Sequence, residues 1–264
     1  MPNITQGAEL SMSRLPALSF RSLLTGTLLA GAVLAQGAQA SDAEIPKDLT
    51  DHLVVNGQSM PVRSVEASPV PGLFEVQLEG GQTLYSDREG KYLLVGDLYR
   101  NDSGQMVNLT EQKQQQHRLA LLKQVPDKDT VVFRPAGEVK AVINVFTDTT
   151  CPYCRKFHEE VPELNKRGVE VRYLAFPRAG MQGEGARELN QVWCSDNRTE
   201  AMTAATKGKK LKGASSCDTP VETQFELGKQ IGIQGTPALI LPDGRMIPGY
   251  VPVDRLVNML GLKN

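Results

Sequence analysis

The pattern of apolar and polar side chains changes along the chain. Between about residues 62 and 95, short segments alternate apolar and polar positions, which is typical of half-buried β-strands, and turns containing glycine or proline separate them. This region therefore predicts an antiparallel sheet, preceded by one short helix over about 46–54. The predicted strands are 62–66, 73–78, 83–85 and 92–95.

A mostly polar helix is predicted to follow this sheet, from Thr110 to Lys123. Thr110 is placed as its N-cap because Glu111 and an amide side chain follow in the first turn, and Pro126 ends the segment. Since most of its positions are polar, we expect much of its surface to face water, which indicates a linker between two domains. Its apolar stripe is short: Leu119, Leu122 and Val125.

Strands and helices alternate in the rest of the chain. A β-α-β unit is predicted first, and a hairpin around Pro242-Asp243-Gly244 and a last helix over 252–260 end the region. A β-α-β half followed by a β-β-α half corresponds to a mixed four-stranded sheet with helices on both faces. The strand-like runs are 131–133, 140–146, 170–176, 238–241 and 246–250.

Two cysteines open the first helix of this region, which is predicted to end near Leu164. In Cys151-Pro152-Tyr153-Cys154, the two intervening residues let both sulfurs lie on one helical turn, where they can form a disulfide that opens readily. The same spacing also builds half of many zinc sites. The pair by itself therefore leaves both chemistries open.

The first 40 residues have the pattern of a secretory signal peptide. Arg14 and Arg21 precede an apolar run over 23–34, and Ala38-Gln39-Ala40 supplies small residues before a cleavage point. The run is shorter than a membrane span needs, so we expect an exported chain that begins at Ser41. All four cysteines follow Ser41 and would meet an oxidising compartment, which favours a redox pair over zinc, and no metal is expected.

The exported part is nearly neutral. Two basic and one acidic residue precede Ser41, which leaves 27 basic and 29 acidic residues, so the charge indicates no nucleic-acid partner. The length suffices for two domains, but a sheet of about forty residues has little core of its own. Its uncovered edge or face favours self-association; the alternative is a sheet packed only on the second domain of its own chain.

Several stretches together resemble the DsbC family of periplasmic disulfide isomerases (DsbC/DsbG type) across essentially the whole mature chain. These are Phe146-Thr147-Asp148-Thr149-Thr150-Cys151, Val171-Arg172-Tyr173-Leu174-Ala175-Phe176-Pro177-Arg178, Trp193-Cys194, Cys217, Gly235-Thr236-Pro237-Ala238 and Pro248-Gly249-Tyr250. The resemblance implies an α+β, cystatin-like N-terminal dimerisation domain over 41–108, a linker helix over 109–126, and an α/β thioredoxin-fold catalytic domain with a helical insertion over 127–264. It also implies a homodimer.

Roles for the site residues follow. Cys151 is expected at the N-terminal end of its helix, where free backbone N–H groups and the helix dipole lower a thiol pKa, so Cys151 would attack substrate disulfides. Cys154, one turn further on and more buried, would be the resolving or escape thiol. By resemblance, Thr236 and Pro237, the latter as a cis-proline, lie in the substrate groove, and Cys194 and Cys217 form a structural disulfide rather than a redox relay.

The leading functional hypothesis is an isomerase that needs no cofactor. It would reshuffle wrong disulfides in misfolded exported proteins in the periplasm, act as a chaperone as well, and be kept reduced by a membrane reductase resembling DsbD. One alternative is a DsbG-like reductase that protects single cysteines from sulfenylation, since Pro152-Tyr153 replaces the Gly-Tyr common in DsbC-type members. Another is a protein that acts mainly as a chaperone.

Other polar side chains near the cysteines receive a plainer interpretation. His158, one turn after Cys154, is predicted to be a surface helical histidine. Arg155 and Lys156 are likewise predicted to lie on a solvated helix face rather than to add positive potential at Cys151.

Overall fold

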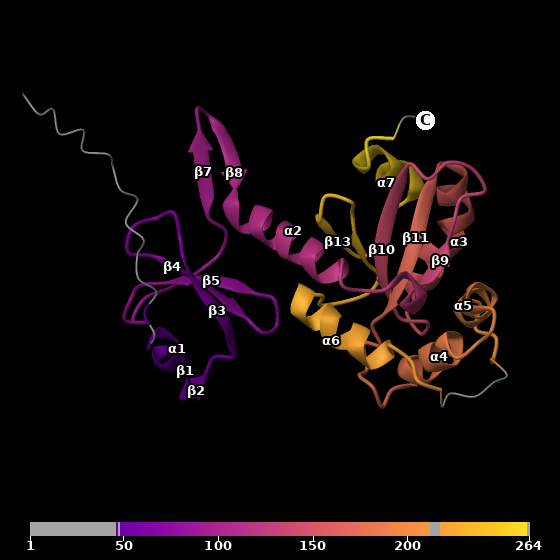
Figure 1. The fold of residues 1–264 in the computed structure, drawn as a ribbon, viewed down its shortest axis with the longest axis horizontal. Helices are drawn as coiled ribbons and strands as arrows, with labels where there is room; N and C mark the ends of the chain where they lie inside the picture. The colour runs from indigo at the N-terminus through magenta and orange to yellow at the C-terminus, as the bar shows by residue number, and fades with distance from the viewer. Residues whose placement is uncertain (1–45, 47, 212–216, 263–264) are drawn as a thin grey trace, which may run out of the picture. The chain divides into compact units, whose positions relative to one another are not determined.

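A computed structural model describes residues 46, 48–211 and 217–262 (Figure 1). The predicted signal peptide over 1–40 lies outside the described residues. Within the described part, no helix combines the length and the apolar character that crossing a membrane requires.

The N-terminal region is built on an antiparallel sheet in the order β3-β4-β5-β6, which confirms the predicted strands. Inward side chains of the sheet, Phe74, Val76 and Leu84, form a small core with Leu49 and Leu53, which lie in and just after helix α1. This helix is shorter than the predicted one. The elements are α1 (Leu49–His52), β3 (Val62–Ala67), β4 (Phe74–Leu78), β5 (Thr83–Ser86) and β6 (Leu93–Val95).

Two hairpins were not predicted. Strands β1 (Val54–Val55) and β2 (Gln58–Ser59) join through Asn56-Gly57, where both residues have positive φ. Asn-Gly is the commonest sequence for such a two-residue hairpin turn, so this signal was present in the sequence. Strands β7 (Tyr99–Asp102) and β8 (Gln105–Asn108) form the second hairpin, which leads directly into the next helix (Figure 1).

Helix α2 (Leu109–Leu122) is the predicted linker helix, but the prediction of its N-cap was wrong. The cap is Asn108, whose side chain accepts a hydrogen bond from the Glu111 N–H at 2.8 Å, because β8 runs straight into the helix. The Thr110 hydroxyl is buried instead, 2.5 Å from the Tyr85 hydroxyl, and accepts from the Leu98 N–H.

The C-terminal region contains a five-stranded sheet in the order β13-β12-β10-β11-β9. Strands β10 and β11 are parallel and joined by α3, and the other pairings are antiparallel. The predicted count of four strands was wrong, because β9 adds to the free edge of β11. The elements are β9 (Val131–Phe133), β10 (Ala141–Thr147), α3 (Pro152–Lys166), β11 (Val169–Ala175), β12 (Ala238–Ile240), β13 (Met246–Pro248) and α7 (Val253–Met259).

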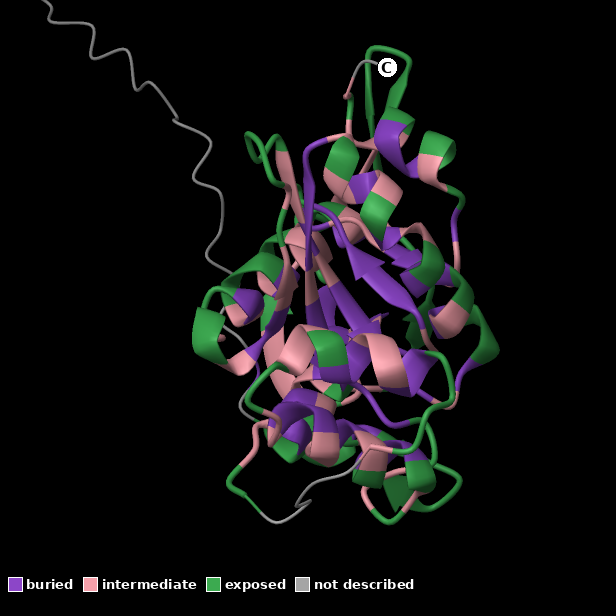
Figure 2. Cartoon of the chain, turned by 90° about the vertical axis from the view of Figure 1, so that its right-hand side faces the viewer, coloured by how far each residue is buried: buried purple, intermediate pink, exposed green. Residues whose placement is uncertain are grey.

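Helices cover both faces of this sheet, as predicted (Figure 2). On β10, Ile143 and Val145 belong to a core shared with α3, whereas Phe146 belongs to a second core shared with α6, since successive strand residues point to opposite faces. The predicted helical insertion comprises α4 (Glu184–Trp193), α5 (Arg198–Thr206) and α6 (Val221–Ile231). The sheet and its covering helices form the α/β thioredoxin fold predicted for this region, which follows the α+β N-terminal region.

Candidate active site

The two thiols of the Cys-Pro-Tyr-Cys motif lie where β10 gives way to α3. Cys151 is the N-cap of α3, and Pro152 occupies the first helical turn, where its fixed φ and missing N–H are tolerated. The Cys151 N–H donates to Asp148 O at 3.0 Å, which closes a short turn just before the helix. The sulfur of Cys151 therefore lies at the positive end of the helix dipole.

Residues far apart in the sequence meet at this point. The Cys151 thiol donates to the Thr236 carbonyl oxygen at 3.3 Å, and the Thr236–Pro237 peptide bond is cis. Strand β12 begins directly after Pro237 and pairs with β10 through Phe146 and Ala238, which fixes the two segments side by side. Four of the residues singled out from the sequence thus form one cluster: Cys151, Cys154, Thr236 and Pro237.

The two thiols have pKa values shifted in opposite directions. Both are reduced, and each is about 1 % exposed. The hydrogen bond from the Cys154 thiol, above all, lowers the pKa of Cys151 to about 5, and the nearby Thr236 side chain, the Cys154 N–H and the positive charge of Arg178 act in the same direction. Burial raises the pKa of Cys154 far above its usual value, and a Cys151 thiolate beside it adds to this effect. At neutral pH the site holds one thiolate and one thiol.

Two side chains that support the thiolate were given no role from the sequence. Asp148 is about 1 % exposed and accepts hydrogen bonds from the N–H and hydroxyl of Thr150 and from the N–H and Nε of Arg178, at 2.6 to 3.1 Å. Burial opposes ionisation, but these donors keep the pKa of Asp148 below its usual value. A Cβ at Gly185 would lie 2.6 Å from the Asp148 carboxylate, so α4 can approach only with glycine there.

The positions of Asp148 and Arg178 in the sequence could have identified them as site residues. Asp148 follows β10 and Arg178 follows β11, and these strands are parallel neighbours, so their carboxyl ends lie at the same edge of the sheet. In sheets of this kind, ligand-binding and reactive groups concentrate at that edge. The Asp148–Arg178 ion pair, 3.1 Å between Oδ2 and Nε, holds a positive charge near Cys151.

His158 is not on the surface, so that prediction was wrong. It is about 7 % exposed, with Nδ1 3.0 Å from the Tyr173 hydroxyl and Nε2 3.0 Å from the Thr203 hydroxyl. Burial, with a further contribution from the charge of Lys207, lowers the pKa of His158 to about 4. The physical reason is that α5 of the helical insertion covers this face of α3, which the local sequence does not reveal.

Of the two basic residues after Cys154, only Lys156 lies on a solvated helix face as predicted, because Arg155 is half-buried. Lys156 is exposed and lies over the ring of Tyr250, with 4.4 Å between Nζ and the ring centre. Arg155 donates from Nε to Thr149 O at 2.8 Å. Tyr153, between the two cysteines, is 63 % exposed and forms part of the surface around the buried sulfurs.

The second pair of cysteines forms a disulfide. Cys194 ends α4, Cys217 precedes α6, and the two are 23 residues apart in the sequence with 5.7 Å between their Cα atoms. The bond joins the end of α4 to the segment before α6, within the helical insertion. Among the described residues, no group of three or more histidine, cysteine, aspartate or glutamate side chains is arranged to hold a metal ion.

Comparisons with known proteins agree across both regions. Residues 36–111 match the family described as disulfide bond isomerase protein N-terminal domain, and residues 126–263 match the thioredoxin-like domain family. The chain is 38 % identical over 223 residues to the thiol:disulfide interchange protein DsbC of Dickeya dadantii, covering 84 % of this chain and 88 % of that protein. It is 35 % identical over 227 residues to DsbC of Escherichia coli K12, covering 84 % and 89 %.

A solved structure with similarity to this chain is that of a disulfide interchange protein from Neisseria gonorrhoeae. The sequences are 33 % identical, the match covers 52 % of this chain and 96 % of that one, and the TM-score is 0.47.

Proposed function

This chain belongs to the DsbC family of thiol:disulfide interchange proteins, and we propose on that basis that Cys151 and Cys154 carry out its activity as a disulfide isomerase. The observation that carries this assignment is the opposite shift of their pKa values at the start of α3. A thiolate, not a thiol, attacks disulfides, so at neutral pH Cys151 is ready to react and Cys154 is held in reserve.

Isomerisation needs only Cys151. Its thiolate attacks one sulfur of a wrong disulfide, forms a bond between Cys151 and that sulfur, and expels the other substrate sulfur as a thiolate. That thiolate then attacks a different disulfide of the substrate, and a final exchange releases Cys151 as a thiolate again. The substrate ends with the same number of disulfides in a new pairing, and the protein is unchanged.

Cys154 serves when this exchange stalls. Its sulfur attacks Cys151 in the mixed disulfide, a Cys151–Cys154 bond forms, and the substrate leaves reduced. Two electrons have then passed to the substrate, so the pair must be reduced again. A membrane reductase resembling DsbD would supply these electrons, which makes it the partner required by the escape route.

Thr236 and Pro237 form the floor of the substrate groove. The backbone of Thr236 lies against the Cys151 sulfur, and a cavity of about 170 Å³ begins beside it, lined by Thr236, Ala238, Pro248 and Gly249 among others. Tyr153 is exposed beside the thiols, and Pro237 has no N–H that could hydrogen-bond to the Cys151 sulfur. An extended substrate segment can therefore approach that sulfur from the side of Thr236 and Pro237.

The protein forms a homodimer through its N-terminal region, over about 41–108, which the linker over 109–126 joins to the catalytic domain over 127–264. The sheet ends at β6, which pairs with β5 and with no other strand of the described residues. Exposed apolar side chains gather on and near this strand, and such an edge is a template for a second chain. They are Tyr92, Leu93, Leu94 and Val95, the last of these 83 % exposed.

The protein acts in the periplasm on misfolded disulfide-containing exported proteins, and a dimer would also provide chaperone activity by enclosing them between two catalytic domains. The alternative of a DsbG-like reductase, raised by Pro152-Tyr153, is not favoured, because the curated relatives at 33 to 38 % identity over most of the chain are interchange proteins of the DsbC type.

Refolding of a scrambled multi-disulfide protein tests the assignment. The wild type should restore native pairing, Cys151→Ala should lose this activity, and Cys154→Ala should keep isomerisation while accumulating mixed disulfides. Recovery at the wild-type rate by Cys151→Ala would contradict the role of Cys151. Suppression of substrate aggregation, measured on the same two variants, separates chaperone activity from thiol chemistry.

The oligomeric state is tested by light scattering on residues 41–264 and on the variant Val95→Asp. The wild type should have twice the mass of one chain, and a charge introduced on the exposed edge strand should reduce it to that of a monomer. A monomeric wild type would contradict the proposed interface.

A further inference from the structure

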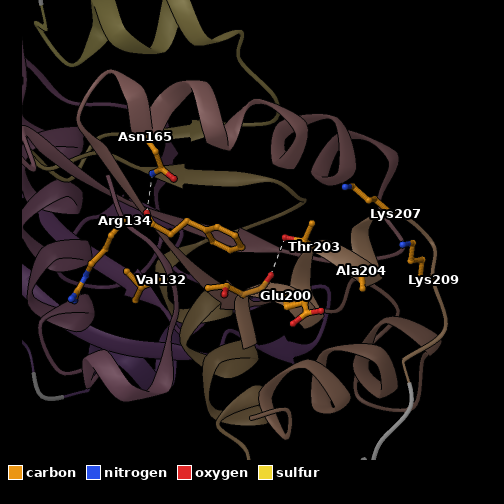
Figure 3. A pocket seen from close by; sticks show the side chains of 10 residues that line it. Val132, Arg134, Asn165, Glu200, Thr203, Ala204, Lys207 and Lys209 are labelled. Atoms are coloured by element: carbon orange, nitrogen blue, oxygen red, sulfur yellow. Dashed lines mark hydrogen bonds between the residues drawn. The ribbon is translucent and has the colours of Figure 1, made fainter. Parts of the chain in front are cut away.

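The small cavity beside the reactive cysteine is lined by uncharged residues alone. It has a volume of about 170 Å³ and lies between the loop over 232–236, which leads into Pro237, and the β12–β13 hairpin. By contrast, a larger cavity of about 560 Å³ between β9 and α5 contains no residue of the thiol cluster and carries charged side chains (Figure 3). These are Arg134, Glu200, Lys207 and Lys209. The small cavity therefore suits an uncharged group.

The small cavity has an apolar floor and an open mouth. Ile233 and Ala238 line it and are buried, and the side chain of Met246, also in the lining, is half-buried. Gln234 and Pro248 line it as well and are exposed, so the cavity reaches the protein surface. A group that enters from solvent can thus bury apolar surface against the floor.

Backbone hydrogen bonds hold the walls of the small cavity in place. The Gly249 N–H donates to Pro237 O at 2.8 Å, and the pairing of β12 with β13 continues from there. On the other wall, the Ile233 N–H donates to Gly228 O at 3.0 Å and ties the loop to the end of α6. The cavity is therefore formed before any substrate arrives, which reduces the ordering that binding would cost.

The small cavity lies within reach of a substrate held at Cys151. Thr236 lines the cavity, and its carbonyl oxygen is 3.3 Å from the Cys151 sulfur. An extended chain advances about 3.3 Å per residue. A side chain one or two residues from the attacked cysteine can therefore reach the cavity while the substrate sulfur is bonded to Cys151.

Gly235 differs from the other glycines that line the small cavity. Gly232 and Gly249 have φ of +90° and +96°, a conformation that side chains rarely adopt, so the backbone itself requires glycine there. Gly235 has no positive φ, and a Cβ built on it would meet nothing within 4 Å. Neither the backbone nor the packing requires glycine at 235. What glycine provides at this position is the open space next to the cavity.

We propose that the small cavity receives an apolar side chain of the substrate, one or two residues from the attacked cysteine, and that Gly235 keeps it open. This inference rests on the proposed role of Cys151. An apolar cavity of about 150 Å³ takes up benzene, so this one has room for a leucine, methionine or phenylalanine side chain. A charged side chain would lose its hydration there without gaining a partner. Cysteines beside apolar residues, which a misfolded chain exposes, are thereby selected.

Short peptides whose single cysteine is joined to a chromogenic aryl thiol measure this selection. Cys151 bonds to the peptide sulfur, the peptide–aryl disulfide breaks, and the aryl sulfur leaves with the electron pair as a coloured thiolate, the better leaving group of the two. Alanine, leucine, phenylalanine or aspartate is placed before the cysteine in one series and after it in another. In at least one series, the wild type should react about tenfold faster with leucine than with alanine, and no faster with aspartate than with alanine.

Two variants should move the preference in different directions. Gly235→Val fills the space beside the cavity and should bring the leucine-to-alanine rate ratio close to one. Met246→Ala removes part of a wall and should raise the rate with phenylalanine relative to leucine by about tenfold. A general loss of structure would not produce both changes. Gly137→Val is the matched control, because Gly137 also has no positive φ and open space at its Cβ but lies outside this cavity, so the wild-type ratios should persist.

Three results would overturn the proposed subsite. They are wild-type rates that do not depend on the neighbouring residue in either series, a leucine preference that survives in Gly235→Val, and an equal loss of that preference in Gly137→Val. Failure of the proposed function looks different, because release of the coloured thiolate at the wild-type rate by Cys151→Ala would remove the role of Cys151. A reaction that requires Cys151 but ignores the neighbouring residue would overturn the subsite alone.

Discussion

The chain carries two pairs of cysteines that the structure treats in opposite ways. Cys151 and Cys154 are buried at the first turn of α3 and remain reduced, whereas Cys194 and Cys217 are more accessible and form a disulfide between the end of α4 and the start of α6. Exposure therefore does not mark the reactive pair. The difference lies in what surrounds each sulfur. The Cys151 sulfur lies at a helix N-terminus with hydrogen-bond donors and the charge of Arg178 nearby, whereas the Cys194–Cys217 bond closes a loop.

This contrast separates a pH-dependent role from a pH-independent one. The first pair should govern reactivity and a part of the free energy of unfolding that changes with pH, whereas the second should contribute to the free energy of unfolding at every pH. Each of the following changes is directed at one pair and should leave the property of the other unaltered.

Replacing both Cys194 and Cys217 with alanine should have the largest effect on stability. The disulfide closes a loop with a sequence separation of 23 residues, and removing it should lower the free energy of unfolding by about 3 kcal/mol through the entropy of the unfolded chain. Denaturant unfolding measures this loss. The rate of Cys151 attack on an aryl disulfide is the control; a tenfold fall in that rate would mean that the two pairs are not independent.

The Cys151 thiolate should itself stabilise the reduced protein in a pH-dependent way. Its pKa is about 5 when folded and 9.0 as a reference, so between these values the unfolded chain holds a proton that the folded chain has lost. Stability should thus rise with pH in this window and be lost as the pH falls towards 5. At pH 7 the contribution should be about 2 kcal/mol, allowing for partial solvent screening.

This contribution is measured as the difference in unfolding free energy between the reduced wild type and Cys151→Ala across that pH range, with the Cys194–Cys217 bond intact in both. A difference that stays constant with pH would contradict a lowered pKa of Cys151.

Within the reactive pair, Cys154→Ala should raise the pKa of Cys151 by about one unit, because it removes the hydrogen bond that lowers this pKa most. The rate of alkylation of the remaining thiol against pH gives the midpoint. Thr236 and Arg178 still act on the sulfur, so a midpoint near 9 would show that the single hydrogen bond accounted for the whole shift.

Arg178→Ala should have the smallest effect, a rise in the Cys151 pKa of less than about one unit, since its charge is the weakest of the causes acting on the sulfur. The same alkylation measurement applies. Arg187→Ala is a suitable control, because that guanidinium binds the Gln182 carbonyl on the surface. Equal shifts of the Cys151 pKa in the two variants would indicate that the loss of any positive charge has this effect, and would contradict a specific role for the position of Arg178.

Much of this arrangement could be predicted from the sequence. Alternating apolar and polar positions predicted the N-terminal sheet, and alternating strands and helices predicted the C-terminal one. The Cys-Pro-Tyr-Cys motif between a strand and a helix placed Cys151 at a helix start, where local geometry decides its environment. The motifs also brought Thr236 and Pro237 to the same groove. Short segments determine these features locally, or a family motif identifies them.

The errors have a shared physical origin in contacts between distant segments. Strand β9 is three residues long, and only its pairing with β11 shows that it extends the sheet. His158 is polar and is followed by Glu159 and Glu160, and its burial depends on the insertion, where Thr203 lies against the ring. Thr110 resembles an N-cap in sequence, but its hydroxyl is hydrogen-bonded to that of Tyr85 on strand β5.

The central claim, that one environment divides the motif into a thiolate and a protected thiol, is tested most directly by titrating the ultraviolet absorbance of the reduced wild type. The predicted result is one thiolate that appears with a midpoint near pH 5, while the second thiol stays protonated throughout the range in which the fold is stable. Two thiolates that appear together at about pH 8.5, the ordinary range of cysteine, would contradict it.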